Sequence, residues 1–539
     1  MRDLIIILAI AVLVVNPFNI YPQDKSDWMG GVPEGCTSIT VGKLASSDGS
    51  VMTSHTDDSH RTRSWMDIVP AKEHEGGAVT TMYKRSACDS FAMPSYKHIP
   101  IGNIPQVKHT FGFVNTAYPC MNEKQLGIGE STFGGRDELQ SDKGLIDCQC
   151  LCRLMLERCT TAREAIKMAD ELTKKYGWSD YGECLTIADK KEVWHFEIVG
   201  PGKDKVGAVW AAQRVPDNHI SVNANASTIK EMDLSNADYY LASKNIFEIA
   251  KSNGWWNENE NFKFCYVYAP KSRESVASRR REWRVFDLLA PSLKLNPNDK
   301  DFPFSIKPDK KVELIDMVNI FKDYYEGTPY DMTRNIKTTD KAGKTIVSPL
   351  ANPFLPYDQL EIQDIPGGWY HVDKKTGHSS FLGERTIARW YTMYGTIIQC
   401  RDWLPDEIGG VVWLAQDNIA TSVYIPVYAG ATDLPESYKT PGRPNGFTHN
   451  SAWWAFNRLG TLTAQRWGDA RHNVDTAFIP MQKELFKNQK AFEQKAIEIE
   501  SNSERNSFIT KYTLKCGNTA VDKAWQLGDD FWTKYDEKF

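Results

Sequence analysis

Residues 36–58 read CTSITVGKLASSDGSVMTSHTDD, and this stretch indicates how the chain begins to fold. Two runs with many β-branched residues, 37–44 and 51–56, flank a Ser-Asp-Gly turn. Such a pattern is typical of two antiparallel strands joined by a short loop. The sequence therefore predicts a β-hairpin near the start of the chain, with Cys36 opening its first strand.

The segment before this hairpin has the features of a secretory signal. Arg2 precedes an apolar run of twelve residues, 4–15, which an Asn-Pro pair ends. Such a run is too short to cross a bilayer but fits the apolar core of a signal peptide. We expect residues 1–35 to be a signal peptide with a short propeptide, and the protein to be secreted or periplasmic. A buried core helix is the alternative. Asp3 and the lack of an A-x-A site leave the cleavage point open.

The composition excludes several classes of protein. With 539 residues, 41% of them hydrophobic, the chain can bury a large core, which excludes a disordered, collagen-like or small disulfide-stabilised protein. The 64 Lys and Arg against 69 Asp and Glu give a net charge of −5, without the basic excess that suits a nucleic-acid backbone. No later segment reaches about eighteen apolar residues. We therefore expect no nucleic-acid partner and no membrane association after processing.

Cysteine is frequent in the chain. Eleven cysteines in an exported protein are expected to be paired or buried, and the odd number leaves at least one without an intramolecular partner. Cys148, Cys150 and Cys152 lie close together, but their spacing differs from the C-x₂-C pattern of zinc sites and no His follows at ligand distance. We expect these three to be structural and to bind no metal.

The rest of the chain groups its strands and helices in clusters. Residues 147–175 show helical periodicity, with Thr161 and Glu164 as a capping box at the start of the second helix. The strand-like runs are 184–189, 192–199, 208–213, 219–223, 409–414 and 422–428, and the charged helical run is 485–500. Residues 296–311 and 334–356, rich in Pro, Asn, Asp and Lys, are expected to be surface excursions. This order predicts an α+β fold, and no glycine motif for nucleotide binding is present.

Cys36 is the residue best placed to carry chemistry. It follows the leader and a glycine-rich stretch, residues 29–35 (MGGVPEG). If the chain is cut between Gly35 and Cys36, one residue carries both a thiol and a free α-amine, whose pKa of about 7.7–8 lets it accept the thiol proton. Before cleavage the same nitrogen is an amide, so the precursor is expected to be inert. A disulfide half, a lipid-anchor cysteine and a buried structural thiol stay open as alternatives.

Several short blocks of sequence are recognisable along the chain. The first is CTSITVGK at residues 36–43, followed by Asp48-Gly49-Ser50 and Asp57-Asp58. The later blocks are 121–124, 129–132, 214–217, 221–225, 281–284 and 401–405. In sequence and order they resemble the secreted cysteine dipeptidases, from Cys36 to about residue 490. These are N-terminal-nucleophile hydrolases, related to bile salt hydrolases and penicillin V acylases.

The resemblance implies a four-layer α/β/β/α sandwich, in which two antiparallel sheets face each other between helical layers. It implies a catalytic domain over residues 36–484 and a helical C-terminal extension over residues 485–539. Cys36 is then the nucleophile and, through its own amine, the base. Asp58 lies where the family's carboxylate orients that amine, a role that needs an acceptor close to an ammonium group. Asp57 is the rival for this role, and a solvated turn is the alternative for both.

The resemblance also implies an oxyanion hole. Its donors are the side-chain amide of Asn225 and a backbone N–H near Thr132, both aimed at the negative charge that develops on the substrate. Asn223, two residues earlier on the same strand face, replaces Asn225 if the alignment shifts. An Asn that only satisfies the end of a strand is the alternative.

Two basic residues are implied near the nucleophile. Arg281 lies where the relatives place an arginine able to lower a thiol pKa, and the arginines at 279, 280 and 284 are its alternatives. His55 stands where many relatives have an arginine, three residues before the orienting Asp. It supplies a positive charge only when protonated, which predicts a pH dependence of activity that the Arg-bearing relatives lack. A core or turn histidine is the alternative.

The resemblance therefore implies an exported cysteine peptidase that cleaves dipeptides or short peptides through a thioester and needs no metal or organic cofactor. Glu130 and an arginine are reasonable partners for the substrate's charged ends. An amidase on N-acyl substrates of the bile-salt or penicillin type shares every catalytic residue and stays open. So does a non-catalytic exported protein that binds peptides or glycans through Trp453 and Trp454. The sequence also leaves open whether the protein forms a homo-oligomer.

Overall fold

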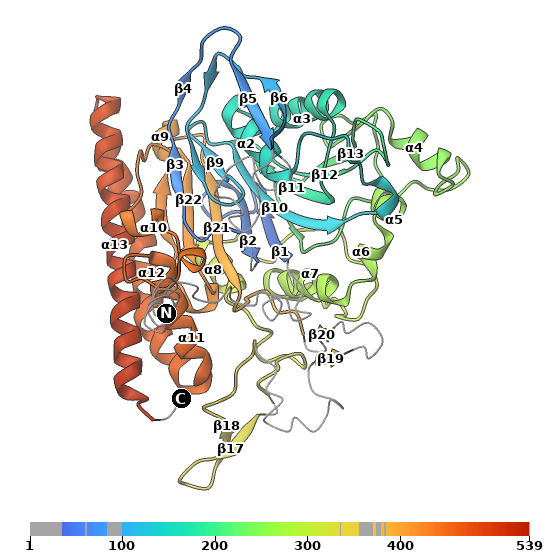
Figure 1. Cartoon of the computed structure of the whole chain (residues 1–539). Helices are drawn as coiled ribbons and strands as arrows, with labels where there is room; N and C mark the ends of the chain where they lie inside the picture. The colour runs from blue at the N-terminus through green and yellow to red at the C-terminus, as the bar shows by residue number, and fades with distance from the viewer. Residues whose placement is uncertain are drawn as a thin grey trace, which may run out of the picture. The chain divides into compact units, whose positions relative to one another are not determined.

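The computed structural model is shown in Figure 1. It describes residues 35–59, 62–83, 100–334, 336–354, 370–372, 379–381 and 384–537. The predicted signal peptide and Cys88 lie outside the described residues.

The chain divides into two compact units. One consists of Gly35–Leu355 and Glu384–Phe539 and contains both large sheets. The other consists of Met1–Glu34 and Pro356–Gly383, and its described part is the hairpin of β19 (Tyr370–Val372) and β20 (Ser379–Phe381).

Cys36 belongs to a seven-stranded sheet whose paired strands are all antiparallel. In spatial order the strands are β16 (Ser305–Ile306), β14 (Ile220–Asn223), β1 (Gly35–Val41), β2 (Val51–Asp58), β21 (Thr392–Cys400), β22 (Val411–Gln416) and β23 (Ile425–Tyr428). The predicted hairpin is confirmed as β1 and β2, and β14 pairs with the other edge of β1.

The second sheet has eight strands, also antiparallel. In order they are β15 (Tyr240–Ala242), β13 (Val209–Arg214), β12 (Val193–Val199), β11 (Gly182–Ala188), β10 (Gly127–Gly134), β9 (Met121–Asn122), β8 (Phe113–Asn115) and β3 (Asp67–Val69). Three small two-stranded sheets pair β4 (Lys72–Glu73) with β7 (His109–Thr110), β5 (Val79–Tyr83) with β6 (Pro100–Pro105), and β17 (Lys337–Thr339) with β18 (Thr345–Val347).

The two large sheets pack against each other through polar contacts. Ser38 donates its hydroxyl to the Glu130 carbonyl oxygen at 2.7 Å, and the Thr53 and Thr186 hydroxyls lie 2.7 Å apart. Because side chains alternate along a strand, the immediate neighbours of Ser38 and Thr53 point away from the second sheet. Ile39 accordingly packs into the hydrophobic core on the far side of the seven-stranded sheet.

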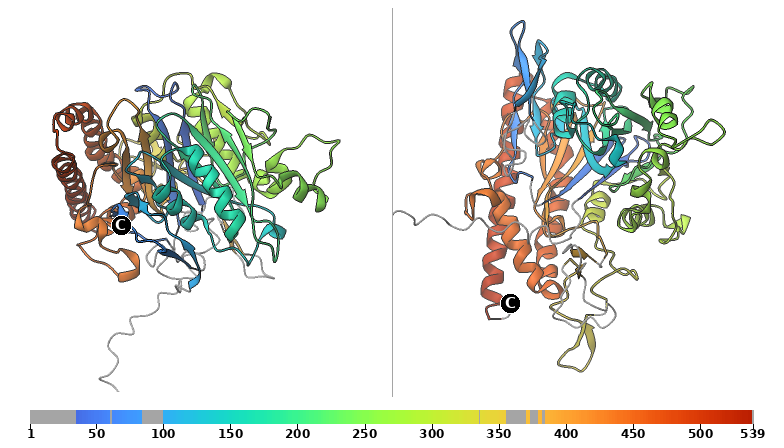
Figure 2. Two further views of the ribbon diagram at one scale, coloured as in Figure 1. Left: turned by 90° about the horizontal axis from the view of Figure 1, so that it is seen from above. Right: turned by 45° about the vertical axis from the view of Figure 1, so that its right-hand side comes forward.

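Helices cover the outer faces of both sheets, as Figures 1 and 2 show. α2 (Cys148–Arg158) and α3 (Ala162–Tyr176) bury their apolar faces against β11 and β12. The helices on the other side, which pack with the seven-stranded sheet, are α7 (Val276–Leu289), α8 (Leu314–Phe321), α11 (Ala452–Gln465), α12 (Trp467–Ile497) and α13 (Asn502–Lys534). The short helices are α4 (Ile246–Ser252), α5 (Phe264–Tyr268), α6 (Pro270–Glu274), α9 (Asp406–Gly409), α10 (Glu436–Lys439), η2 (Asp137–Leu139), η3 (Pro291–Leu293), η5 (Ile419–Thr421) and η6 (Arg443–Asn445).

Most predicted elements have direct counterparts. The predicted mixture of helices with antiparallel sheets is confirmed, and β11, β12, β13, β14, β22 and β23 lie within or next to the predicted runs. Thr161 caps α3 by accepting from the Glu164 N–H. The Glu164 carboxylate turns back to the backbone N–H groups of Thr160, at 2.8 Å, and Thr161.

The structure differs from the prediction in one surface excursion and at one domain boundary. The predicted surface excursion 296–311 contains β16, which joins the sheet beside β14. A two-residue strand is too short to leave a periodic signal in the sequence. Most of the helical run 485–500 belongs to the second half of α12, which ends at Ile497, so the predicted domain boundary between residues 484 and 485 falls inside one helix.

The ten cysteines in the described part of the chain are all buried, and none of them forms a disulfide. The sequence predicted cysteines that are either paired or buried, and these ten are buried. Within the same residues, no helix combines the length and apolar character that crossing a membrane requires.

Candidate active site

The site forms where β1 begins, between its two neighbouring strands. Cys36 pairs with Asp57 across the hairpin, and Gly35 pairs with Asp58. Only 6% of Cys36 is exposed. Directly opposed residues of an antiparallel pair share one face of the sheet. Cys36 and Asp57 therefore both face the second sheet, where β10 carries Glu130.

The thiol of Cys36 is held in its protonated form. Its Sγ lies 3.2 Å from Oε2 of Glu130 and donates to that carboxylate. Burial, followed by the negative charges of Glu130, Asp57 and Asp58, raises the pKa of the Cys36 thiol well above its usual range. A protonated thiol is a poor nucleophile. With Gly35 still joined to it, Cys36 is therefore not activated.

Glu130 is one of a pair of buried carboxyls. The hydroxyl oxygen of Thr132 lies 3.0 Å from both Glu130 Oε1 and Glu183 Oε1. Burial and the charge of Glu130 raise the pKa of Glu183 well above its usual range. Burial opposes ionisation of Glu130 too, but nearby His55, Glu183 and Cys36 outweigh it and lower the pKa of Glu130. A neutral Glu183 can donate to Thr132, which then donates to an ionised Glu130.

The backbone of Cys36 is held from two sides. Its N–H donates to Oδ1 of Asn225 at 3.0 Å, and its carbonyl oxygen accepts from Nη1 of Arg281 at 2.6 Å. Arg281 comes from α7 and also donates to Thr37 Oγ1, to the Ala224 carbonyl and to Asn225 Oδ1. Burial and the charge of Arg385 lower the pKa of Arg281 to about 9. The guanidinium thus stays charged near neutral pH and fixes the backbone rather than the sulfur.

Asn225 is fixed just beyond the end of β14. Its backbone has a φ of 59°, a left-handed conformation that Asn tolerates better than most residues. Its N–H donates to Ser131 Oγ at 2.9 Å, and its Nδ2 donates to the Thr132 carbonyl oxygen at 2.7 Å. The alternative, Asn223, instead donates its side-chain N–H to the Ala226 carbonyl at 2.8 Å. Asn225 is therefore the one of the two that contacts Cys36.

The two adjacent aspartates occupy different environments. Asp58 is buried and ion-paired with Arg385, and it accepts from the hydroxyl of Thr392 at 2.5 Å. Burial raises the pKa of Asp57 to about 7, although His55 and Thr62 favour its ionised form. Asp57 Oδ2 has no hydrogen-bond partner among the described residues.

His55 lies on β2, on the same face as Asp57. Its ring packs edge-on between Tyr118 and Tyr394, with centroid distances of 5.5 and 5.6 Å. Its Nε2 lies 3.4 Å from Oε2 of Glu130. His55 therefore approaches the carboxylate that accepts from Cys36. The donor atoms of Cys36, His55 and Glu130 all lie within 4.8 Å of one another, a set that can hold a metal ion.

Gly35 occupies a position that admits no side chain. A Cβ added there would lie 2.2 Å from Oδ1 of Asn225. That amide cannot turn aside freely, because it is bonded to Cys36, Arg281 and Thr132. The residue before Cys36 must therefore be glycine for this arrangement to form.

The structure brings together Cys36, His55, Thr132, Asn225 and Arg281, with Asp58 on the neighbouring position of the hairpin. Two further residues escaped the sequence analysis. Glu183 opens a buried strand, and a charged residue in such a place is a signal that could have been used. Arg385 belongs to no recognisable motif, and nothing local in its sequence indicates that it pairs with Asp58.

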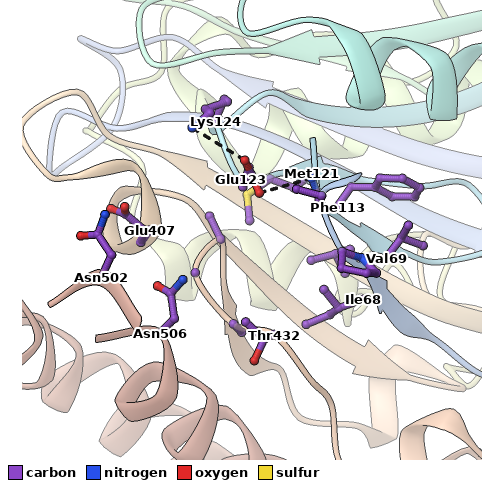
Figure 3. A pocket seen from close by; sticks show the side chains of 17 residues that line it. Ile68, Val69, Phe113, Met121, Glu123, Lys124, Glu407, Thr432, Asn502 and Asn506 are labelled. Carbon is purple, nitrogen blue, oxygen red and sulfur yellow. Dashed lines mark hydrogen bonds and ion pairs between the residues drawn. The ribbon is translucent and has the colours of Figure 1, made fainter. Parts of the chain in front are cut away.

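A separate pocket of about 330 Å³ lies between strands β3, β8 and β9, at one end of the eight-stranded sheet, and the start of α13 (Figure 3). Its Glu123 is already engaged by Lys124 at 3.7 Å and by the Gly112 N–H at 3.3 Å. None of the predicted site residues lines this pocket. It is therefore distinct from the Cys36 site.

A comparison with family models matches residues 35–479 to peptidase family C69. The match covers most of the chain and begins one residue before Cys36. The chain belongs to peptidase family C69.

Two named dipeptidases are similar to this chain over most of their length. A probable dipeptidase of Latilactobacillus sakei is 25% identical over 450 residues, which is 80% of this chain and 82% of the relative. Dipeptidase A of Lactobacillus helveticus is 22% identical over 446 residues, covering 81% and 83%. Family C69 membership supports a peptidase, and the cysteine class is implied by the family's name.

Proposed function

We propose that this C69 peptidase is an exported cysteine dipeptidase, with the four-layer sandwich of the N-terminal-nucleophile hydrolases. Cys36 becomes its N-terminal residue when the Gly35–Cys36 bond is cut. The names of the similar proteins from Latilactobacillus sakei and Lactobacillus helveticus support dipeptides as the substrates. The apolar run near the N-terminus supports export to a secreted or periplasmic location.

The observation that carries the proposal is the hydrogen bond from the Cys36 N–H to Asn225, next to a thiol that burial and acidic neighbours keep protonated. Cutting the bond before Cys36 replaces an amide with an amine at the same place. An α-amine has a pKa of about 7.7–8 and can accept the thiol proton. Cleavage thus supplies the base that the uncut chain lacks.

The reaction then runs by acyl transfer. The Cys36 thiol gives its proton to the Cys36 amine as sulfur attacks the substrate carbonyl, and the ammonium returns that proton to the leaving amine. A water molecule hydrolyses the resulting thioester. One N–H of the Asn225 side chain is bound to the Thr132 carbonyl, and its second N–H is available for the oxyanion. A backbone N–H near Thr132 is the second donor that we propose.

Glu130 supports dipeptides over N-acyl substrates. Its Oε2 lies 3.2 Å from Sγ, and its lowered pKa keeps it ionised. In a dipeptide the free ammonium group is one carbon away from the carbonyl under attack, so it can pair with this carboxylate. An N-acyl substrate has no charge there and therefore cannot form this ion pair with Glu130.

The experiment is an intact-mass measurement of the purified protein, followed by assays on dipeptides and on N-acyl amides of matched size. We expect a chain that starts at Cys36 and hydrolyses dipeptides. An active chain that retains Gly35 contradicts the mechanism. Faster hydrolysis of the N-acyl amides contradicts the proposed substrate class and favours the amidase alternative.

A further inference from the structure

Three different metal-binding donor atoms meet at the start of β1. Glu130 Oε2 lies 3.2 Å from Cys36 Sγ and 3.4 Å from His55 Nε2, and all three atoms lie within 4.8 Å of one another. They come from β1, β2 and β10, so two packed sheets fix their positions. Thiolate, imidazole and carboxylate are the protein ligands of Zn²⁺.

The histidine faces this cluster, and its Nε2 contacts Oε2 of Glu130 at 3.4 Å. His55 is 1% exposed, and its Nε2 forms no hydrogen bond of good geometry with any residue that the structure describes. Tyr118 and Tyr394 hold its ring from both sides. The long contact with Glu130 leaves this buried nitrogen poorly hydrogen-bonded, and a cation between His55, Glu130 and Cys36 would satisfy it.

The spacing suits a tetrahedral ion. Bonds of about 2.0–2.3 Å at tetrahedral angles place neighbouring donor atoms about 3.3–3.6 Å apart. The two measured separations, 3.2 and 3.4 Å, are close to these values. The third separation, between Cys36 Sγ and His55 Nε2, is no more than 4.8 Å, so rotation of these two side chains toward the ion would complete three coordination positions.

We propose that Cys36, His55 and Glu130 form an inhibitory Zn²⁺ site in the mature protein. The inference rests on the proposed function in one respect: the α-amine released by cleavage is the fourth ligand, and together with its own thiolate it closes a chelate ring on the ion. Zinc then occupies both the nucleophile and the carboxylate that binds the substrate's ammonium group, so it competes with dipeptides.

A neighbouring group of donors is less suitable. Glu130, Cys148 and Glu183 also lie within 4.8 Å of one another. This group offers no nitrogen ligand, and Thr132 already engages both of its carboxyls. Cys148 is therefore the matched control for Cys36, because both are buried thiols beside the same carboxylate pair.

The test is a titration of the purified metal-free protein with Co²⁺ and then Zn²⁺ at one neutral pH, in a reductant that does not bind metals. Cobalt bound by a thiolate absorbs in the near ultraviolet. We expect this band to saturate at one ion per chain and to disappear when Zn²⁺ displaces Co²⁺. His55→Gln and Glu130→Gln should each weaken binding at least about tenfold, since even indirect ligand partners contribute that much.

The controls locate the ion. Cys36→Ser should abolish the band, whereas Cys148→Ser should retain it. His109→Gln, which changes an exposed His–Glu pair, should also leave it unchanged. A missing band, a band that survives Cys36→Ser or a band lost in Cys148→Ser overturns the proposal. If a variant fails to fold, the wild-type stoichiometry and competition between Zn²⁺ and a dipeptide still decide the question.

Failure of the site and failure of the function give different results. Dipeptide hydrolysis without a cobalt band rejects the zinc site and retains the peptidase mechanism. A band of one ion per chain without hydrolysis of any dipeptide retains the site and rejects the proposed function.

Discussion

Cys36 and Cys148 are two buried thiols on either side of the Glu130–Glu183 pair, and they differ in what surrounds their backbones. Burial is the largest factor that raises the pKa of each thiol well above its usual range. Cys148 lies inside the chain at the start of α2, where its N–H donates to Asp180 at 3.3 Å. Cys36 begins a strand, with Asn225 on its nitrogen and Arg281 on its carbonyl oxygen. The comparison shows that burial and nearby carboxylates hold both thiols in the protonated form. In the function that we propose, only Cys36 is activated, because cleavage changes its backbone nitrogen.

The largest expected effect separates these two cysteines. Cys36→Ala should reduce kcat/KM for a dipeptide by at least about 10³-fold, because the nucleophile is lost. Cys148→Ala should stay within a few-fold of the wild type, because no chemistry depends on that sulfur. Steady-state kinetics on both variants measure the contrast. Equal losses in the two variants would contradict the assignment of the nucleophile.

The next effect concerns the residue that precedes Cys36. Gly35→Ala places a Cβ 2.2 Å from Asn225 Oδ1, so the bond to be cut moves out of position. Misplacement by about 1 Å can cost about 100-fold, and we expect release of the Cys36 N-terminus to slow by that order. Mass spectrometry over time measures it. Gly76→Ala is the control, since a Cβ there meets nothing within 4 Å. Normal maturation of Gly35→Ala would show that Asn225 moves freely.

A smaller effect is expected at Thr132, whose hydroxyl connects Glu130, beside Cys36, with Glu183, beside Cys148. Thr132→Val removes the hydroxyl that joins Glu130 to Glu183 and keeps the shape of the side chain. A lost buried hydrogen bond costs about 1 kcal/mol, so we expect kcat/KM to fall roughly five- to tenfold. Thr132→Ser restores a hydroxyl and should recover most of the activity. A Val variant as active as the wild type would mean that Glu130 keeps its ionisation without Thr132.

The last prediction concerns Asp417, a buried carboxyl away from both cysteines, and its expected effect is on stability rather than activity. Burial raises the pKa of Asp417 to about 7, although Asn457, Asn418 and Arg443 favour the ionised form. Between about pH 4 and pH 7 the unfolded chain ionises this carboxyl and the folded chain does not, so the free energy of unfolding falls as pH rises. Asp417→Asn should remove this loss.

Asn suits this position because the φ of residue 417 is 56° and the side chain can still accept from Asn457. We expect Asp417→Asn to stabilise the protein by a few kcal/mol at pH 7.5 and to change little at pH 4. Thermal or urea unfolding at both pH values measures it. A gain that is the same at both pH values would show that packing, and not ionisation, is responsible.

The parts of the site that could be predicted are those that short, continuous segments of the sequence encode. The 36–58 hairpin follows from β-branched runs around a turn. Its pairing places Asp57 opposite Cys36 and Asp58 next to it. The Asn225 and Arg281 assignments came from short recognisable blocks, and both residues contact Cys36. The partners of these residues were harder to predict, because they reach the site from distant segments of the chain.

Arg385 and Glu183 illustrate this limit. Arg385 pairs with Asp58 across more than three hundred residues, and neither side chain carries a local sign of the other. Glu183 and Glu130 share a hydroxyl because β10 and β11 pair in one register, which brings Thr132 opposite Glu183. A shift of one residue would turn each of these side chains to the other face of the sheet.

The sequence by itself determined the first hairpin, the place of Cys36 at the start of a strand and the pairs of helices and strands that make an α+β chain, because local periodicity and turn residues encode these features. The tertiary structure alone decided the state of the thiol. It placed Glu130 of one sheet against Cys36 of the other, excluded water from both and left His55 facing them. Charge and burial act through space, so no pattern along the chain can report them.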